Sequence, residues 1–139
     1  MKHKTKIQLR FKDLDSLGHV NNANFVTYFE LSRVDYFRAV MGTKKIDWST
    51  EGIILKKIEM LFNAPILLEN EIYVYTRVSR FGTKSFDMSC SIVNQLSDRE
   101  VEVASGLAVV VCLNYKTGKT IEIPPLWKQK IIEFEEKSD

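Results

Sequence analysis

The first ordered pattern in the chain is an alternation of apolar and polar residues between positions 5 and 12. Ile7, Leu9 and Phe11 fall on one side of this alternation, and basic or amide side chains fall on the other. A period of two is the spacing of a strand with one face against a core. Residues 13–22 are then rich in residue types that favour turns and helix caps. The pattern therefore predicts a strand followed by a loop.

A long helix is expected next, over residues 23–41. Gly42 follows it directly and is a suitable residue for the end of a helix. Apolar side chains occupy most of its circumference, at positions 25, 26, 28, 29, 34, 36, 37, 40 and 41. A helix of this kind is surrounded by protein. Glu30 and Arg33 interrupt the apolar surface three residues apart, so we expect them to pair with each other or to form the edge of a site.

Strands dominate the rest of the chain. After a polar connector, residues 43–50, we expect strands over residues 52–62, 69–80, 84–94, 101–114 and 120–123. Pro125 can start a terminal helix before a solvated acidic tail, with four side chains facing inward: Leu126, Trp127, Ile131 and Phe134. This order predicts an α+β fold in one domain, residues 1–139. A curved antiparallel sheet of five to six strands would wrap around the long central helix, with a short C-terminal helix beside it.

One sheet and one helix leave the outer face and an edge of the sheet uncovered. Tyr73, Tyr75 and several valines fall at positions that could be exposed there. A second copy of the chain commonly covers such edges and apolar faces. We therefore expect a homodimer or homotetramer that pairs through the sheet.

Composition narrows the class of protein. Hydrophobic residues make up 45% of the 139 residues and charged residues 27%, the balance of a globular domain rather than a disordered chain. The net charge of +2 is too small for a protein that coats nucleic acid. The longest apolar run, Leu107–Leu113, is far shorter than the ~20 residues of a membrane span, and the N-terminus lacks the apolar segment of a secretory signal. Cys90 and Cys112 are too few for a disulfide scaffold and are expected to be buried, so we expect a cytoplasmic protein with no membrane or nucleic-acid partner.

Most familiar catalytic patterns are absent from the sequence. His3 and His19 are the only histidines, and no pair of His or Cys residues has the spacing of metal ligands. No G-x-S-x-G nucleophile elbow and no glycine-rich phosphate loop occurs. We therefore expect neither a metal nor another cofactor.

Candidate chemistry remains at the start of the long helix, where Asp15 precedes Asn22. Free backbone N–H groups and the positive end of the helix dipole stabilise an electron-rich oxygen at a helix start. A carboxylate held beside them could attack a carbonyl carbon, or activate water against it. The alternative is that Asp15 and Asn22 only cap the turn and the helix, each contributing ~1 kcal/mol to stability.

The chain resembles a known family in the residues around this loop. The motif reads Arg10-Phe11-x-Asp13-x-Asp15-x-x-Gly18-His19-Val20-Asn21-Asn22, followed by Phe25, Tyr28-Phe29-Glu30 and Arg33. It resembles the hot-dog fold acyl-CoA thioesterases of the 4-hydroxybenzoyl-CoA thioesterase type. Its His-Val-Asn-Asn form is similar to the branch that contains long-chain acyl-CoA and plant-type acyl-carrier-protein thioesterases.

This resemblance implies an enzyme that converts an acyl-CoA or acyl-carrier-protein thioester to a free carboxylic acid and a thiol. Asp15 takes the place of the family's catalytic carboxylate, as nucleophile or general base. Asn22 takes that of the residue whose backbone N–H polarises the thioester carbonyl. The resemblance also implies an active site where two subunits meet, and coenzyme A would enter only as part of the substrate.

Four further residues of the motif are implied to bind substrate: Gly18, His19, Asn21 and Phe25. Gly18 would let the backbone approach the acyl group closely. Asp13 is implied to support the loop without taking part in catalysis. Ser16 and Leu17 stand where the hydroxybenzoyl enzymes carry small or proline residues, so we do not expect a hydroxybenzoyl substrate.

Two other functions stay open on the sequence. A non-catalytic protein that binds acyl thioesters would use the same site without turnover. A hot-dog hydratase or dehydratase would act on the same ligands, but that chemistry requires a catalytic histidine with a partner acid. His19 has no clear partner of this kind in the motif.

Overall fold

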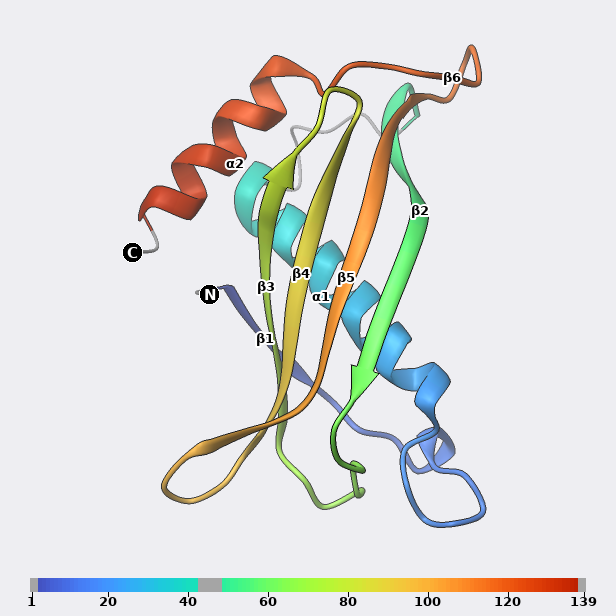
Figure 1. Ribbon diagram of the computed structural model, residues 1–139, viewed down its shortest axis with the longest axis vertical. Helices are drawn as coiled ribbons and strands as arrows, with labels where there is room; N and C mark the ends of the chain where they lie inside the picture. Colours follow the sequence, from blue (N-terminus) through green and yellow to red (C-terminus); the bar gives the residue numbers. More distant parts are fainter. Residues whose placement is uncertain (1–2, 43–48, 138–139) are drawn as a thin grey trace.

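The structure, a computed structural model, describes residues 3–42 and 49–137 and consists of a curved sheet with one long helix lying across it (Figure 1). The strands are β1 (His3–Ile7), β2 (Glu51–Phe62), β3 (Ile72–Phe81), β4 (Ser85–Gln95), β5 (Glu100–Asn114) and β6 (Lys119–Thr120), and the helices are α1 (Asn22–Met41) and α2 (Pro125–Lys137). Residues 43–48 of the expected connector and the last two residues of the acidic tail lie outside the described residues. The expected α+β architecture, with its C-terminal helix, is confirmed.

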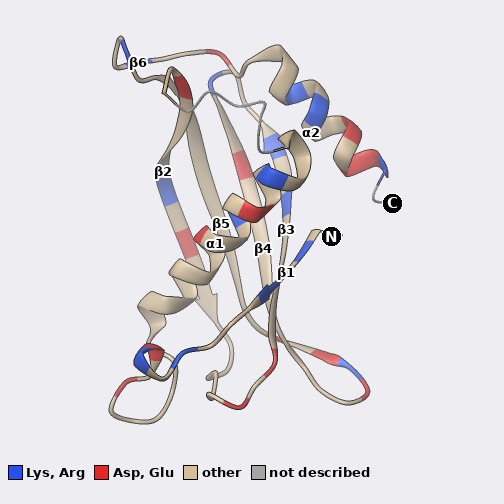
Figure 2. Ribbon diagram, turned by 180° about the vertical axis from the view of Figure 1, so that it is seen from behind, with Lys and Arg blue, Asp and Glu red and all other residues tan. Residues whose placement is uncertain are grey.

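The sheet is antiparallel throughout, in the order β1-β3-β4-β5-β2, and β6 pairs with the end of β5. Register shifts interrupt three of its ladders, between Leu55 and Lys57, between Val78 and Arg80, and between Ile92 and Val93. Irregularities of this kind increase the local twist of a sheet. The long strands therefore curve over the helix, which lies behind them in Figure 1 and in front of them in Figure 2.

Helix α1 has clear signals at both ends. Asn21 precedes it, and its side-chain oxygen accepts a hydrogen bond from the Ala23 backbone N–H at 2.9 Å, which satisfies one of the free donors of the first turn. Gly42 ends it with a φ of 75°, a left-handed conformation that favours glycine. All four charged residues of α1 lie beyond its first two turns (Figure 2): Glu30, Arg33, Asp35 and Arg38.

One part of the expectation for α1 is wrong for the single chain. The side facing the sheet is buried, including Phe25, Phe29 and Phe37. Leu31 and Val34, outside the buried stripe of the helix, are 52% and 44% exposed. The sheet covers only the side of the helix that it faces, so one chain does not surround α1.

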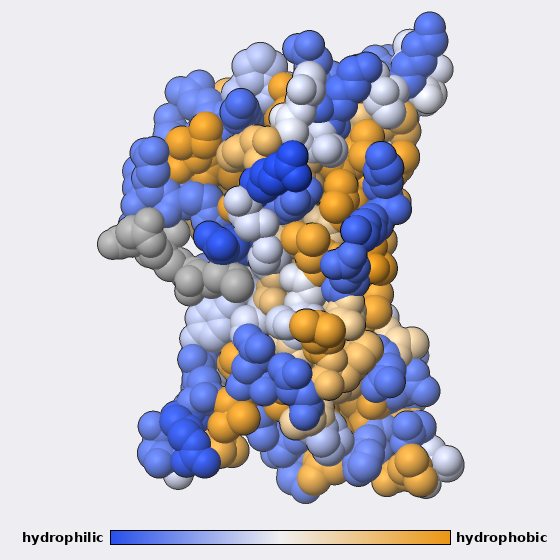
Figure 3. Space-filling view, viewed as in Figure 1, coloured by the Kyte–Doolittle hydropathy of each residue, from blue (hydrophilic) through white to orange (hydrophobic). Residues whose placement is uncertain are grey.

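The core lies between α1 and the inner face of the sheet. The alternation expected in β3 and β4 is confirmed, because Ile72, Val74, Thr76 and Val78 are buried, as are Phe86, Met88, Cys90 and Ile92. In β5 the small or medium side chains of Ala108, Val110 and Cys112 face inward. The outer face of β5 carries the side chains of Leu107, Val109, Val111 and Leu113. They are half-buried and contribute to an apolar band over β5 and β2 (Figure 3).

The N-terminal strand is shorter than its alternation indicates. Strand β1 ends at Ile7, and residues Phe11–Asp13 form a 3₁₀ turn in which Phe11 is 80% exposed. The Asp13 backbone N–H donates to the Arg10 carbonyl at 2.9 Å, and the Asp13 carboxylate accepts from the Arg10 N–H at 3.2 Å. These bonds turn the chain away from the sheet. The prediction of a strand over residues 5–12 is therefore wrong beyond Ile7.

Helix α2 begins at Pro125 as expected, but its packing differs from the prediction. Trp127 and Ile131 are buried, whereas Leu126 is 53% exposed, because the helix contacts the rest of the fold along a narrow stripe. The acidic C-terminal end of α2 is also not wholly exposed to solvent. One Glu135 carboxylate oxygen accepts hydrogen bonds at 3.1 Å from the Tyr36 hydroxyl and from the Val78 backbone N–H, which fastens α2 to α1 and β3. None of the helices in the described ranges has the length and apolar character needed to cross a membrane.

His3, the first residue of β1, is held in the fold. Its backbone pairs with Thr76 of β3, and its ring lies edge-on to Tyr36 with the centroids 5.5 Å apart. The Nε2 atom lies 3.2 Å from a carboxylate oxygen of Asp35. The buried Nδ1 atom has no hydrogen-bond partner among the described residues. Burial lowers the pKa of His3, and the nearby Asp35 and Glu135 carboxylates oppose this shift without cancelling it.

This environment makes a pH dependence of stability testable. A histidine with a lowered pKa in the folded state stabilises the fold above its unfolded pKa of about 6.5. That contribution is lost as the pH falls below this value, because the unfolded state then binds the proton more tightly. We expect the melting temperature of the wild type to fall more steeply between pH 7.5 and 5.5 than that of His3→Phe, measured by differential scanning calorimetry. His19→Gln should keep the wild-type slope, and an unchanged slope in His3→Phe would contradict this account.

Candidate functional site

The loop that precedes α1 is a small hydrogen-bonded ladder. Leu14 and Val20 form an antiparallel bridge, and the Asp15 N–H donates to the His19 carbonyl at 2.8 Å. One step closer to the helix, the Asn21 N–H donates to the Asp13 carbonyl at 2.9 Å. Asp15 therefore lies two residues along the ladder from Asp13, whose partner Asn21 adjoins the helix start. Two residues of an extended strand span about 7 Å.

Asp13 anchors this ladder to the core. Its side chain is 1% exposed and accepts hydrogen bonds from the Tyr28 hydroxyl at 2.7 Å and from Arg10 Nη2 at 2.9 Å. Burial alone would raise the pKa of Asp13, but the hydrogen bonds from Tyr28 and Arg10 outweigh it and hold the pKa below its usual value. Burial, followed by the bond to this carboxylate, raises the pKa of Tyr28. Asp13 thus supports the loop through hydrogen bonds, and Tyr28, which hydrophobic periodicity counted only as core, is one of its donors.

Asp15 presents an accessible carboxylate at the far end of the ladder. The residue is exposed, and its Oδ1 atom accepts a hydrogen bond from the Leu17 N–H at 2.9 Å. The turn is closed by a bond from the Gly18 N–H to the Asp15 carbonyl at 3.1 Å, with Gly18 at a φ of 79°. This left-handed conformation favours glycine. The second carboxylate oxygen, Oδ2, accepts no hydrogen bond from the described residues, so it is available for chemistry.

The helix start offers a free donor. The Asn21 side chain caps the Ala23 N–H, and the Asn24 N–H donates to the Asn21 carbonyl at 2.9 Å. The Asn22 N–H lies between them and donates no hydrogen bond within the described part of the chain. The capping role considered for Asn22 therefore belongs to Asn21. An unpaired N–H at a helix start is suited to receive an oxyanion, since the helix dipole adds to its partial charge.

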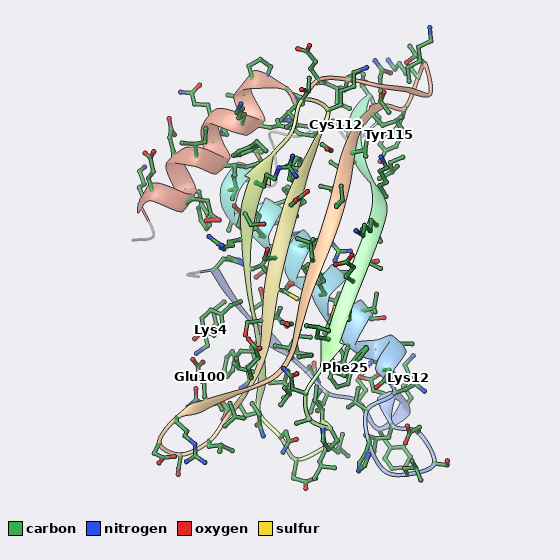
Figure 4. All side chains as sticks on the ribbon, in the orientation of Figure 1. Lys4, Lys12, Phe25, Glu100, Cys112 and Tyr115 are labelled. Atoms are coloured by element: carbon green, nitrogen blue, oxygen red, sulfur yellow. The ribbon has the colours of Figure 1, made fainter. Side chains whose placement is uncertain are left out.

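The other expected substrate-binding residues lie near this loop in different environments. Phe25 is buried, and its ring meets Phe62 of β2 edge-on with the centroids 5.2 Å apart. His19 is half-buried, and it forms no contact with a carboxylate in the described ranges. Figure 4 shows Phe25 and Lys12 at the loop end of the molecule, and Tyr115 and Cys112 at the opposite end. A hydratase site with a histidine paired to an acid is not formed at His19.

A cavity of about 760 Å³ lies between the second half of α1 and strands β2 and β5. Val34 and Phe37 of α1, Leu55 of β2 and Val110 of β5 contribute apolar walls. Neither Asp15 nor Asn22 lines this cavity. The single chain therefore brings the carboxylate and the helix start onto one ladder but does not enclose a substrate between them.

No group of three or more His, Cys, Asp or Glu side chains in the described ranges could hold a metal ion. Both cysteines are buried and unpaired with each other. Burial raises the pKa of Cys90 to about 12 and that of Cys112 to about 11, so both thiols stay protonated at neutral pH. Neither is a nucleophile in this fold.

The chain is similar to known proteins over most of its length. Residues 9–131 match the thioesterase-like superfamily. The long-chain acyl-CoA thioesterase FadM of Escherichia coli (strain K12) is 25% identical over 133 residues, covering 91% of this chain and 95% of that protein. The chloroplastic acyl-acyl carrier protein thioesterase ATL3 of Arabidopsis thaliana is 22% identical over 138 residues, covering 99% of this chain and 71% of that protein. A solved thioesterase from Thermus thermophilus, in complex with coenzyme A and Zn, is 30% identical with a TM-score of 0.78, covering 92% of this chain and 95% of that one.

Proposed function

The chain belongs to the thioesterase-like superfamily, with the hot-dog fold of its structural relatives, and from this premise we propose that it hydrolyses an acyl thioester of coenzyme A or of acyl carrier protein. The products are a free carboxylic acid and a thiol. Within the superfamily we assign it to the 4-hydroxybenzoyl-CoA thioesterase type, in its acyl-CoA and acyl-carrier-protein branch. The proposed location is the cytoplasm, where thiols such as Cys90 and Cys112 stay reduced.

One observation carries this proposal: the ladder of the loop connects an open carboxylate oxygen of Asp15 with a free N–H at Asn22. The thioester carbonyl oxygen would accept a hydrogen bond from the Asn22 N–H, which stabilises the negative charge that develops on it. Asp15 would take a proton from water as the water oxygen attacks the carbonyl carbon, or would attack that carbon itself. When Asp15 acts as base, the carbon–sulfur bond breaks and the leaving thiolate takes up the proton that Asp15 holds. When Asp15 is the nucleophile, the same bond breaks to leave an acyl–Asp15 anhydride and a thiolate, and water then hydrolyses the anhydride and supplies the proton that the thiolate takes up.

The neighbouring residues would position the acyl group. Gly18, without a side chain, leaves the turn beside Asp15 open to the substrate. Asn21 holds the first turn of α1 in place through its cap. His19 would contact the substrate from the ladder, and Phe25 would form the apolar floor below the helix start together with Phe62.

We propose that a second copy of the chain completes the site. Among the strands of the described residues, β2 has a neighbour on one side only, β5, and is therefore an edge of this sheet. It carries exposed apolar side chains, among them Leu61 at 69% and Phe62 at 45%. Phe62 packs on Phe25 beside the loop, so a subunit paired along β2 would cover the open side of Asp15 and Asn22. Edge strands of this kind are commonly closed by another chain.

The oligomer can be tested by sedimentation velocity. We expect the wild type to sediment as a dimer or tetramer at micromolar concentration. Leu61→Lys should shift it toward the monomer, because a charged side chain in an apolar contact costs several kcal/mol. Leu126→Lys, which changes an exposed leucine on α2 instead, should leave the oligomer intact. A monomeric wild type, or equal effects of both substitutions, would refute pairing through β2.

The function itself is tested by thiol release from a chain-length series of acyl-CoA esters. We expect turnover well above the buffer rate for at least one chain length. No thiol release from any ester, despite measurable binding, would favour the non-catalytic binding protein. An absorbance change with an enoyl-CoA, without thiol release, would favour a hydratase.

A further inference from the structure

Arg33 is a buried cation that forms no salt bridge with a carboxylate in residues 3–42 or 49–137. The residue is 6% exposed, and its Nη1 atom has no hydrogen-bond partner among the described residues. Of the two alternatives expected for Glu30 and Arg33, the salt bridge is not formed: Glu30 is exposed and acts on Arg33 only over a longer distance. Both residues line the same cavity, as the other alternative expected. The Cys90 thiol also lies near, but its raised pKa of about 12 keeps it neutral. The guanidinium therefore lacks the anionic partner that buried charges normally have.

An unpaired buried guanidinium lowers the stability of the fold. Burying a charged group without hydrogen bonds opposes folding, and the cost lowers the pKa of Arg33 despite the favourable influence of Glu30. The Phe29 ring, 4.4 Å from the guanidinium carbon, offers a face for stacking but no acceptor. A partner from outside the described chain would supply what the fold does not.

Arg33 is part of the wall of the 760 Å³ cavity between α1, β2 and β5. Most of the remaining wall is apolar, including Val34, Phe37, Ile53 and Leu55. Arg38 and Glu30 also line it and nearly cancel each other's charge. A small apolar cavity with one buried cation fits a ligand that joins an aliphatic chain to a single planar anion. A guanidinium matches a carboxylate in this way, through two parallel hydrogen bonds.

We propose that this cavity binds the carboxylate of an aliphatic chain, with Arg33 as its anchor. Two sources share this chemistry. One is a free fatty acid, which is also the product class of the proposed hydrolysis. The other is the far carboxylate of a dicarboxylic acyl thioester, since Arg33 lies eleven residues, about 16 Å, beyond the helix start at Asn22. The binding itself requires no hydrolysis.

The test measures dodecanoate binding by isothermal titration calorimetry, with dodecanamide as a neutral probe of the same length. A charge-assisted bond to a buried guanidinium should make wild-type binding of dodecanoate about 10–100-fold tighter than that of the amide. Arg33→Met should bind both probes equally. Arg38→Met, a matched change on the rim of the same cavity, should keep most of the preference for dodecanoate.

Folding of the variants is checked by thermal unfolding without ligand. Arg33→Met should melt at the same temperature as the wild type or higher, because it removes an unpaired buried charge. If it does not fold, Arg33→Lys takes its place, and it should lose about tenfold in dodecanoate affinity because it lacks the planar fork. Equal wild-type affinities for acid and amide, or no binding of dodecanoate, would overturn the proposal. So would Arg33 variants that change only the subunit dissociation constant, since Arg33 would then pair across a subunit contact.

The two sources are separated by comparing kcat/KM for dodecanedioyl-CoA and dodecanoyl-CoA in the wild type and in Arg33→Met. A preference for the dicarboxylic ester that disappears in the variant assigns the cavity to the far end of the substrate. Dodecanoate binding without such a preference assigns it to the free acid. Because the binding arm contains no thioester, a failure of the proposed hydrolysis and a failure of this proposal give different results.

Discussion

Replacing Asp15 by asparagine is expected to lower kcat by at least about 100-fold while KM stays nearly unchanged. A positioned carboxylate typically accelerates a reaction by about 10²–10⁴-fold, and the amide can neither take the proton from water nor attack the carbonyl carbon. The turn should survive the change, because the amide oxygen of asparagine can still accept the hydrogen bond that Oδ1 accepts from the Leu17 N–H. An effect on kcat without one on KM marks an interaction made in the transition state.

The matched control is Asp98→Asn, which makes the same chemical change in the exposed turn between β4 and β5. Asp98 contacts only its neighbour Arg99 within the described residues, 3.3 Å away. Its kcat should stay within about twofold of the wild type, since exposed substitutions away from a site have small effects. Full activity of Asp15→Asn would remove Asp15 from the mechanism. A rise in KM alone would make it a binding residue instead.

Replacing Asp13 by alanine is expected to lower the free energy of unfolding by about 2–4 kcal/mol. The buried Tyr28 hydroxyl would lose its acceptor, and an unpaired buried polar group costs about 1–3 kcal/mol. The bonds from Arg10 would be lost as well, but they contribute less because half of that side chain is exposed to water. Urea unfolding followed by circular dichroism measures the change, with Asp98→Ala expected within about 0.5 kcal/mol of the wild type.

Lowering the pH should reproduce part of this loss of stability in the wild type. Because the folded-state pKa of Asp13 is below its usual value, its stabilisation is complete above the unfolded pKa and disappears as the pH falls through that value toward the folded one. Stability of the wild type should therefore decrease below about pH 4, and Asp13→Ala should show a shallower decrease. Equal acid sensitivity of the two proteins would show that Asp13 is not stabilised as a carboxylate.

The two aspartates of the loop, two residues apart, thus have separate expected signatures. Asp13 accepts its hydrogen bonds from the core and should act on stability. Asp15 accepts one bond from its own turn and should act on turnover. The sequence could place both in the motif, and it could place the helix start beside them. The resemblance implied the supporting role of Asp13, and the physical reason is its hydrogen bonds from Tyr28, a tertiary contact, and from the neighbouring Arg10.

Local patterns predicted most of the elements because their causes are local. Gly42 ended the helix where expected, and the alternation in β3 and β4 identified the buried face. The prediction was wrong at residues 8–12, where hydrogen bonds between Arg10 and Asp13 override the alternation. The sequence also left open whether Glu30 and Arg33 form a pair or the edge of a site, since spacing on a helix surface does not show which side chain the sheet will bury.

By itself, the sequence determined the order of helices and strands, the glycine that ends α1 and the residues that the loop carries, because hydrophobic period and capping depend on near neighbours. The tertiary structure decided which apolar face of β5 points inward, which side of α1 stays uncovered and that Arg33 is buried with no carboxylate partner among the described residues. These outcomes depend on how the curved sheet meets the helix, and therefore on contacts between residues far apart in the chain.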